Sequence, residues 1–453
     1  MDVFELFNSQ RNYYLKGGTK SYEFRMNSLI KLKSVMKIHE KDLYEALKLD
    51  LNKSEQEAYM TEIGLVYEDI SYALKHLKKW MKVKKVKAPL AMYPSSCYIY
   101  REPYGVTLVM SPWNYPVLLT LQPVVGAIEG GNTCIIRPSS QTPNVAQVIF
   151  QIIEEAFNKE YIYCVLGSRE VADQLFEQDF DLIFFTGSPH IGKKVLSCAA
   201  NHLTPCVLEL GGKSPCIVTE KANISLAARR IVFGKTINSG QTCVAPDYLV
   251  VHESKREELI KAIKAEILLQ FPKGMLNDDS YPKIISTSAF ERLTYLISKE
   301  KVIYGGKNDG KRIELTLVDA TFDSVIMEDE IFGPILPILT YNNEDDLIST
   351  INSRPTPLAC YVYTDSKTQE KKIINAIPFG GGCVNDCLVH LSASSLPFGG
   401  LKQSGMGQYH GRRSFETFTH FKPILKHKTW LDISFRYHPF SEKKKSWIKK
   451  FIK

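Results

Sequence analysis

The chain has 453 residues, of which 44% are hydrophobic and 23% are charged, a composition typical of a folded globular protein. This length exceeds one ordinary hydrophobic core and predicts two or three packed units. The ten cysteines follow no regular framework and no apolar run approaches the roughly 20 residues of a membrane-spanning helix, which excludes a disulfide-stabilised secreted domain and an integral membrane protein.

The N-terminal part of the chain predicts helices, followed by a change to strands. Apolar residues recur at helical spacing over about the first 85 residues, with predicted helices at 24–39 and 59–79. From residue 97 the pattern predicts strands at 98–101 and 106–110, which end in turn residues.

Helices and strands then alternate along the chain. An apolar helix is predicted at 117–128, a strand at 133–136 and a helix at 144–157. This alternation predicts an α/β fold with a parallel, doubly wound sheet. A new strand at 215–219 predicts that a second α/β unit starts shortly after residue 208.

A glycine-containing turn joins a predicted strand at 182–185 to a predicted helix at 191–200. Gly187 and Gly192 enclose this turn, and Ser188 supplies a hydroxyl near the helix start. The start of a helix can hold a phosphate group through its free N–H groups. The spacing between the glycines differs from the common G-x-G-x-x-G, so the turn alone is a weak indication of dinucleotide binding.

The net charge of +8 is concentrated in two basic clusters, one of which is the tail at residues 443–453. In a helix, Trp447, Ile448, Phe451 and Ile452 share one face, and lysines cover most of the rest. This pattern favours peripheral contact with an anionic membrane surface, and the alternative is a solvated, frayed terminus. Neither cluster carries a recognised nucleic-acid docking motif, so no nucleic-acid partner is predicted.

Location and metal content follow from absences in the sequence. The N-terminal residues lack the basic and apolar regions of a secretory signal, and the scattered thiols fit a reducing compartment, so we expect a cytoplasmic protein. Cys383 and Cys387 are close together, but no second Cys/His pair lies nearby. No metal site is therefore predicted.

Two segments 34 positions apart carry groups for covalent catalysis. Glu209 comes just before a pair of glycines, and Cys243 lies in the small, uncharged segment SGQTCVAP (239–246). A thiol nucleophile and a carboxylate base can form and then hydrolyse an acyl intermediate. The alternative for Cys243 is a buried small hydrophobe, and for Glu209 an exposed surface carboxylate.

With these segments the chain resembles the NAD(P)-dependent aldehyde dehydrogenases, specifically the class 3, fatty-aldehyde branch. The resemblance runs from about the first helix to residue 421, and its overall pattern is also similar to bacterial dehydrogenases of carotenoid-derived aldehydes. The matching motifs, in family order, are SPWNYP (111–116), FTGS (185–188), ELGGKSP (209–215), GQTC (240–243), EIFGP (330–334), LPFGG (396–400) and SGMGQYHG (404–411).

The resemblance implies three catalytic residues. Cys243 is expected to attack the aldehyde carbon and form a thiohemiacetal, which collapses to a thioester after hydride leaves. Asn114 is expected to stabilise the alkoxide together with the Cys243 backbone N–H. Glu209 is expected to activate the water that hydrolyses the thioester.

The resemblance also implies the residues that hold NAD or NADP. Glu330 is expected to bind the ribose hydroxyls next to the nicotinamide, and Phe332 to pack beside the ring. Trp113 belongs to the same set, together with the turn formed by Gly187, Ser188 and Gly192.

One departure from the family concerns cofactor choice. Many relatives have Lys-Pro-Ser-Glu where this chain has RPSS (137–140). The family's glutamate repels a 2′-phosphate, whereas Ser140 carries no charge and Arg137 can pair with phosphate bidentately. We therefore expect NADP to be accepted at least as readily as by Glu-bearing relatives, although a neutral substitution is equally compatible with the sequence.

The resemblance implies an organisation and a substrate class. Residues 1–208 are expected to bind the cofactor, interrupted by a bridging arm at about 88–101 that joins two subunits into a homodimer. Residues 209–395 are expected to form the catalytic domain, 396–430 to return to the cofactor domain and arm, and 431–453 to form the tail. The expected substrate is a hydrophobic aldehyde that is long-chain, aromatic or carotenoid-derived, and the alternative function is a silent or esterase-like membrane-associated scaffold.

Overall fold

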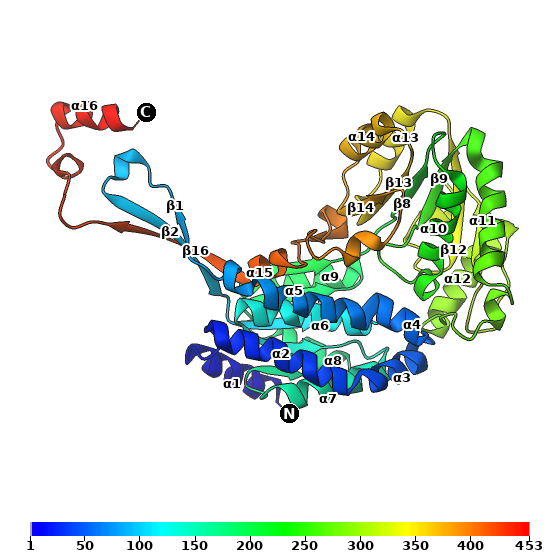
Figure 1. The fold of residues 1–453 in the computed structure, drawn as a ribbon, viewed down its shortest axis with the longest axis horizontal. Helices are drawn as coiled ribbons and strands as arrows, with labels where there is room; N and C mark the ends of the chain where they lie inside the picture. Colours follow the sequence, from blue (N-terminus) through cyan, green and yellow to red (C-terminus); the bar gives the residue numbers. More distant parts are fainter. Residues whose placement is uncertain (1, 453) are drawn as a thin grey trace.

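The computed structural model describes residues 2–452, and its N-terminal segment is helical up to Trp80 (Figure 1). Serine and aspartate side chains cap several of these helices, for example Ser21 and Ser54, which accept backbone N–H groups of the first turn. The helices are α1 (Val3–Leu15), α2 (Tyr22–Ile38), α3 (Glu40–Leu51), α4 (Glu55–Ala58) and α5 (Gly64–Trp80).

The predicted helix at 59–79 differs from the structure in its first turn. Tyr59–Ile63 forms one turn of π-helix, and regular α-helix begins only at Gly64. The wider turn leaves Glu62 fully buried, although a surface position would be usual for a glutamate. Apolar periodicity cannot predict such a turn, and single π turns are frequent at functional sites.

A six-stranded sheet forms the centre of the lower part of the molecule in Figure 1, in the order β15-β7-β6-β3-β4-β5. Five of its strands are parallel, and the short β15 is antiparallel to β7. The strands are β3 (Val106–Met110), β4 (Thr133–Arg137), β5 (Ile162–Cys164), β6 (Leu182–Thr186), β7 (Cys206–Glu209) and β15 (Gly405–Met406). The helices between them are α6 (Pro116–Gly130), α7 (Pro143–Ala156), α8 (Arg169–Phe176) and α9 (Pro189–Ala200).

The strand order reverses direction next to β3. From β3 the chain moves to β4 and β5 on one side, and it then returns to place β6 and β7 on the other side. In open α/β sheets, ligands bind outside the carboxyl ends of the strands at such a reversal. The crevice in this sheet therefore lies beyond Met110 of β3 and Thr186 of β6.

A seven-stranded sheet follows, in the order β10-β11-β12-β9-β8-β13-β14, and the strand predicted at 215–219 is present as β8. All neighbouring strands in this sheet are parallel except β10 and β11, which form an antiparallel pair. Its strands are β8 (Pro215–Val218), β9 (Tyr248–His252), β10 (Lys301–Tyr304), β11 (Thr316–Asp319), β12 (Ile335–Tyr341), β13 (Ala359–Tyr363) and β14 (Gly381–Val384). Its helices are α10 (Ile224–Thr236), α11 (Arg256–Gln270), α12 (Thr287–Lys299), α13 (Glu344–Asn352) and α14 (Lys367–Ala376).

A three-stranded antiparallel sheet projects from the body of the molecule (Figure 1). It contains β1 (Lys84–Val86), β2 (Ser95–Pro103) and β16 (Thr419–His427), and we call it the arm. The helix α15 (Arg412–Thr417) leads into β16, and α16 (Glu442–Phe451) lies beyond the arm.

The C-terminal tail is helical over most of the predicted length. Within α16, Trp447 is exposed and Ile448 is half-buried, whereas the side chain of Phe451 and residue 453 lie outside the described part of the chain. Among residues 2–452, every helix is too short or too polar to span a bilayer.

Candidate active site

Cys243 follows a sharp, strongly anchored turn after α10. Asn238 and Ser239 have positive φ angles of 49° and 52°, a conformation that non-glycine residues adopt only when the surroundings enforce it. The side chain of Gln241 fixes the turn, because its Nε2 donates to Lys283 O at 3.0 Å and its Oε1 accepts from Ile285 N at 3.0 Å. The thiol is therefore presented by a rigid loop.

Asn114 lies in the loop between β3 and α6 and is 3% exposed. Its Nδ2 donates to Gln241 O at 3.1 Å, which joins the Asn114 loop directly to the Cys243 loop. The amide has two N–H groups, and this bond uses one of them. The role predicted from the sequence, stabilisation of an oxyanion at Cys243, would use the second N–H.

Glu209 is the last residue of β7 and is 2% exposed. It lies opposite Thr186 of β6 and Gly405 of β15, and among residues 2–452 its carboxylate oxygens have no well-aligned hydrogen-bond partner, the nearest donor being the backbone N–H of Gly400. Burial raises the pKa of this carboxyl well above its usual range. In its ionised form such a carboxylate is a stronger base than an ordinary one and can take a proton from water.

The thiol of Cys243 is half-buried and faces two carboxylates. Burial raises the pKa of Cys243, and the negative charges of Glu330 and Glu209 raise it further. The thiol therefore stays protonated near neutral pH in the protein alone, and activation requires a base or a nearby positive charge. Both carboxylates named from the sequence thus act on the predicted nucleophile.

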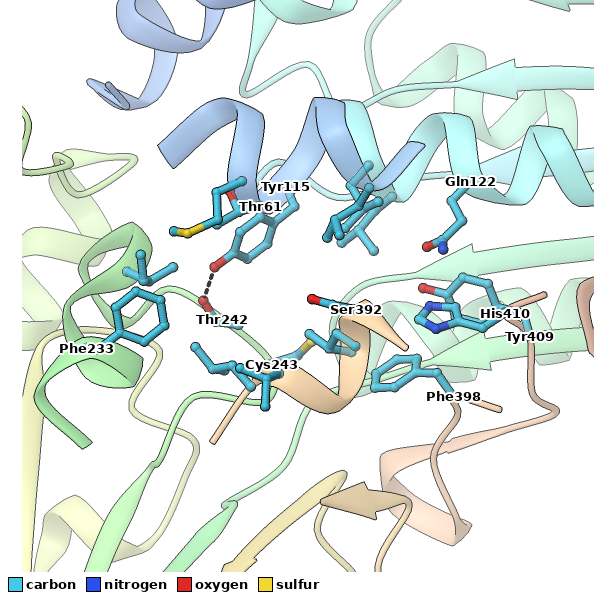
Figure 2. Close-up of a pocket in the computed structure, with 18 residues that line it drawn as sticks. Thr61, Tyr115, Gln122, Phe233, Thr242, Cys243, Ser392, Phe398, Tyr409 and His410 are labelled. Carbon is cyan, nitrogen blue, oxygen red and sulfur yellow. Dashed lines mark hydrogen bonds between the residues drawn. The ribbon is translucent and has the colours of Figure 1, made fainter. Parts of the chain in front are cut away.

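An apolar pocket opens onto Cys243. In Figure 2, Phe233 lies at one end of the pocket, and Gln122, Tyr409 and His410 lie at the opposite end. Tyr115 is fixed beside the thiol, because its hydroxyl bonds to Thr242 Oγ1 at 2.5 Å. The remaining residues of the wall are mostly apolar: Met60, Thr61, Leu65, Leu118, Leu119, Ile237, Leu388, Val389, Leu391, Ser392 and Phe398.

Two polar side chains, Gln122 and His410, lie at one end of this pocket. Gln122 Oε1 and His410 Nδ1 are buried without a hydrogen-bond partner among residues 2–452. Burial lowers the pKa of His410 to about 3, so its imidazole is neutral, and it stacks on Phe398 with ring centroids 5.3 Å apart. Its packing supports the shape of the pocket and does not indicate acid–base chemistry.

The turn between β6 and α9 borders the crevice of the six-stranded sheet. Ser188 is the N-cap of α9, and its Oγ accepts Ile191 N at 3.4 Å. Gly192 lies against Leu210, where a Cβ would come within 2.7 Å of Cδ2, so the glycine allows close packing of helix and strand. Gly187 extends the pairing of β6 with β7 by one residue, because its N–H donates to Glu209 O at 3.0 Å.

A second group of predicted cofactor residues lies on the other side of the crevice. Burial raises the pKa of Glu330 to about 8, and its carboxylate lies against Gly211, where a Cβ would collide with it. Phe332 has a positive φ of 50°, and its ring contacts Trp113 edge-on at 5.5 Å between centroids. Both sides of the crevice can therefore contact one extended ligand, and these residues fit a dinucleotide.

Arg137 is the last residue of β4 and Ser140 follows it, at the edge of the same crevice. Ser140 is exposed, and Arg137 is half-buried. The Arg137 guanidinium is turned toward the loop before α8, where Nη2 donates to Ser168 O at 3.1 Å. Pairing with a 2′-phosphate would therefore require this side chain to turn.

Three charged residues near the site were absent from the sequence prediction. Lys53, Glu57 and Glu62 come from α4 and its neighbouring turns, and each is at most 8% exposed. Their helical spacing is that of a solvated surface, so the sequence contains no signal that distinguishes them. The structure brings them within hydrogen-bond distance of the Asn114 and Asn238 loops.

Comparisons with known proteins identify relatives over nearly the whole chain. The model of the aldehyde dehydrogenase family matches residues 16–424. The 4,4'-diaponeurosporen-aldehyde dehydrogenase of Staphylococcus aureus is 44% identical over 99% of this chain and 98% of its own length. The dimeric, NADP-preferring aldehyde dehydrogenase of Canis lupus familiaris is 38% identical over 93% of this chain and 94% of its own. The structure described as the substrate-bound state of Staphylococcus aureus AldH superposes with a TM-score of 0.97 at 44% identity, and each chain is covered fully.

Proposed function

Because this chain belongs to the aldehyde dehydrogenase family, it oxidises aldehydes to carboxylic acids with NAD or NADP, and we propose that its substrate is a long-chain, aromatic or carotenoid-derived aldehyde. The apolar pocket at Cys243 is the observation that carries this proposal. Such a wall favours a hydrophobic chain over a short polar aldehyde. The name of the relative from Staphylococcus aureus describes a carotenoid-type aldehyde and agrees with this class. Nothing among the relatives supports the alternative of a silent scaffold.

We propose that Cys243 forms the covalent intermediate. Its sulfur bonds to the aldehyde carbon once the thiol has lost its proton, and the carbonyl π electrons move to oxygen. The free N–H of Asn114 and the Cys243 backbone N–H then stabilise the oxyanion. NAD or NADP supplies the oxidant by accepting hydride from the same carbon. As the carbonyl re-forms, a thioester remains on Cys243.

Glu209 is proposed to act in the second half of the reaction. Its buried carboxylate takes a proton from water, and the resulting hydroxide attacks the thioester carbon. The carbon–sulfur bond breaks, the carboxylic acid leaves, and the Cys243 sulfur is released. The raised pKa of Glu209 supports this role, because the carboxyl retains the proton until it can be passed on.

For the cofactor, we propose that Glu330, Phe332 and Trp113 hold the nicotinamide end and that the turn at Ser188 contacts the phosphates. Arg137 and Ser140 are proposed to admit NADP, since the exposed Ser140 leaves the crevice edge without a negative charge. The NADP preference named for the canine relative supports this idea.

We also propose the predicted division of the chain, with cofactor binding in 1–208 and catalysis in 209–395. The arm is proposed to join two subunits into a homodimer. Neither face of β16 is covered along most of its length, and Phe421, Ile424 and Leu425 are 44%, 42% and 49% exposed. The canine relative is named as dimeric.

Peripheral contact with an anionic membrane is proposed for the tail. Trp447 of α16 stacks on Phe435 and is still 45% exposed, and Trp430 and Phe440 are more than 60% exposed. These aromatic side chains share the tail with its lysines, the combination that binds at a charged lipid surface.

A series of aldehydes of increasing chain length, including a polyene aldehyde, tests the substrate class with each cofactor. We expect kcat/KM to rise about threefold to fourfold per methylene until the pocket is filled, because each buried methylene contributes about 0.8 kcal/mol. A flat dependence on chain length would contradict the hydrophobic substrate. A strong preference for NAD in the same series would contradict the proposed role of Arg137 and Ser140.

A further inference from the structure

We propose that Lys53, acting with Glu62 and Glu57, is a positioning residue that sets the location of the Asn114 amide relative to Cys243. The inference rests on the proposed roles of Asn114 and Cys243. It assigns a function to a buried cation that does not itself reach the substrate pocket.

Lys53 has an unusually complete set of partners for a lysine. Its side chain is fully buried, and its Nζ donates to Glu62 Oε1 at 2.6 Å and to the backbone oxygen of Asn114 at 3.0 Å. The same Nζ lies 4.0 Å from the centroid of the Tyr115 ring. The Lys53 ammonium group therefore contacts Asn114 and Tyr115, two consecutive residues of the loop between β3 and α6.

Glu62 completes the contact to the other end of this loop. The carboxylate oxygen that Lys53 does not use accepts the backbone N–H of Val117 at 2.8 Å, in the first turn of α6. A negative charge is favourable there because the N–H groups at a helix start have no partner within the helix. The Lys53–Glu62 ion pair thus holds the segment from Asn114 to Val117 at two points, the carbonyl oxygen of Asn114 and the backbone N–H of Val117.

Glu57 extends the same network to the nucleophile loop. Its Oε1 accepts the backbone N–H of Asn238 at 2.8 Å, within the turn that has positive φ angles. Asn238 Nδ2 in turn donates to Asn114 O at 2.8 Å and to Gln241 O at 3.1 Å. The carbonyl oxygen of Asn114 therefore accepts from both Lys53 and Asn238.

These contacts join two parts of the fold that meet at the active site. Asn114 follows β3 of the six-stranded sheet, whereas Asn238 and Cys243 precede β9 of the seven-stranded sheet. Residues 53–62 bond to both loops, so they fix the separation between the oxyanion donor and the thiol. Misplacement of a catalytic group by about 1 Å can reduce a rate about a hundredfold. A buried ion pair is itself weak evidence for stability, because burial of both charges costs desolvation energy.

The variants K53M and K53M/E62Q test the inference. K53M alone leaves Glu62 buried without its cation, and the double variant removes both charges while an amide oxygen remains for the Val117 N–H. We expect kcat for the aldehyde to fall at least tenfold in the folded double variant, with KM changed less than twofold. E266Q is the matched control, since Glu266 is buried and pairs with Arg229 at 3.3 Å.

A comparison of two reactions of Cys243 separates a positioning role of Lys53 from general damage to the active site. Hydrolysis of p-nitrophenyl acetate forms an oxyanion at Cys243 and should fall by the same factor as aldehyde oxidation. Alkylation of Cys243 by iodoacetamide forms no oxyanion, and its rate, followed by peptide mass spectrometry, should stay within twofold of the parent. An equal loss of alkylation would overturn the inference, because it would indicate a disordered nucleophile loop.

A double-mutant cycle with N114A completes the test. If Lys53 acts through the Asn114 amide, adding K53M/E62Q to N114A should lower kcat little further. Independent, multiplicative losses would overturn the positioning role while leaving the proposed role of Asn114 intact. If N114A alone retains full activity, the assignment of Asn114 fails and the inference fails with it.

Discussion

Glu209 is the proposed base for thioester hydrolysis, and its loss should separate the two halves of the reaction. In E209Q the amide cannot take a proton from water, so hydrolysis should slow by about a hundredfold to ten thousandfold. Acylation does not require this carboxylate, and one equivalent of NADH should still form rapidly. Stopped-flow NADH absorbance and the intact mass of the acyl-enzyme measure the two steps. Loss of the NADH burst in E209Q, but not in a control E220Q at an exposed position, would contradict the assignment.

Glu330 should hold the pKa of the Cys243 thiol high in the protein without cofactor. Its charge is the second cause of the raised pKa after burial, so E330Q should lower the pKa and increase the thiolate fraction at a given pH. The rate of Cys243 alkylation by iodoacetamide, measured from pH 7 to 10, should therefore be higher at each pH in E330Q than in the parent. An unchanged profile would show that Glu330 does not act on the thiol.

The sequence drew attention to candidate residues that lie in distinctive motifs, and it missed buried charged residues that lie outside such motifs. Cys243, Glu209 and Asn114 occur in short segments rich in glycine, proline and small residues. Lys53 lies in the short connection between α3 and α4 and Glu62 in the π turn, and only the three-dimensional packing buries them. Local sequence does not reveal which helix face a distant loop will cover.

At the level of elements, buried strands and amphipathic helices were predictable because their patterns depend on local burial. The strand β6 and the helix α7 agree with the predicted ranges to within one residue at each end. The two-residue strand β15 was not predicted, since its pairing with Leu208 and Glu209 depends on residues almost 200 positions away. That pairing fixes the backbone at Glu209, the proposed base.

The arm offers a direct test of the proposed homodimer. Substitution of the exposed Ile424 and Leu425 by glutamate should place charges in the interface and convert the dimer to a monomer. Light scattering after size-exclusion chromatography measures the mass. K426Q, at an exposed position of the same strand, is the matched control. A parent protein that is monomeric at micromolar concentration would contradict the dimer.

The tail can be tested independently of the arm. Deletion of residues 435–453 should abolish co-sedimentation with vesicles that contain anionic lipid, and binding of the full chain should weaken as salt rises. Replacement of the tail lysines by glutamine should have most of the same effect, because each contributes about 1 kcal/mol near such a surface. Equal binding of the truncated and full chains would contradict the proposed contact.

At the scale of the whole molecule, the active site is assembled where the two large sheets meet. Glu209 ends a strand of the six-stranded sheet, and Cys243 precedes a strand of the seven-stranded sheet. The sequence predicted both α/β units but not how they pack, since that depends on contacts between distant residues. The charges of both Glu209 and Glu330 act on the thiol, and both acids are buried in the interior.

These acids should make the protein less stable as pH rises. Burial raises the pKa of Asp69 and Glu57 to about 7 and that of Glu330 to about 8, and it also raises the pKa of Glu129 and Glu209. A raised carboxyl pKa means that the folded state binds the proton more tightly than the unfolded state. The contribution of each such protonated carboxyl to the free energy of unfolding is complete below about pH 4 and is lost as pH rises through the folded-state pKa.

The range from pH 6.5 to 8 shows this effect most directly. Two further groups act there: burial lowers the pKa of Lys235 to about 8, which opposes the acids near pH 8, and hydrogen bonds to Glu155 and Asp42 raise the pKa of His39, which acts in the same direction as the acids. Burial lowers the pKa of His390 to about 4 and that of His410 to about 3, so these groups oppose the acids only below about pH 6.5. Between pH 6.5 and 8 we therefore expect the melting temperature to fall, with each carboxyl that is still protonated contributing up to about 1.4 kcal/mol per pH unit. The variant D69N/E129Q removes two buried acids whose oxygens have no partner among residues 2–452, and it should flatten the slope. A melting temperature that rises with pH over this range in the parent would show that these carboxyls are ionised in the folded protein.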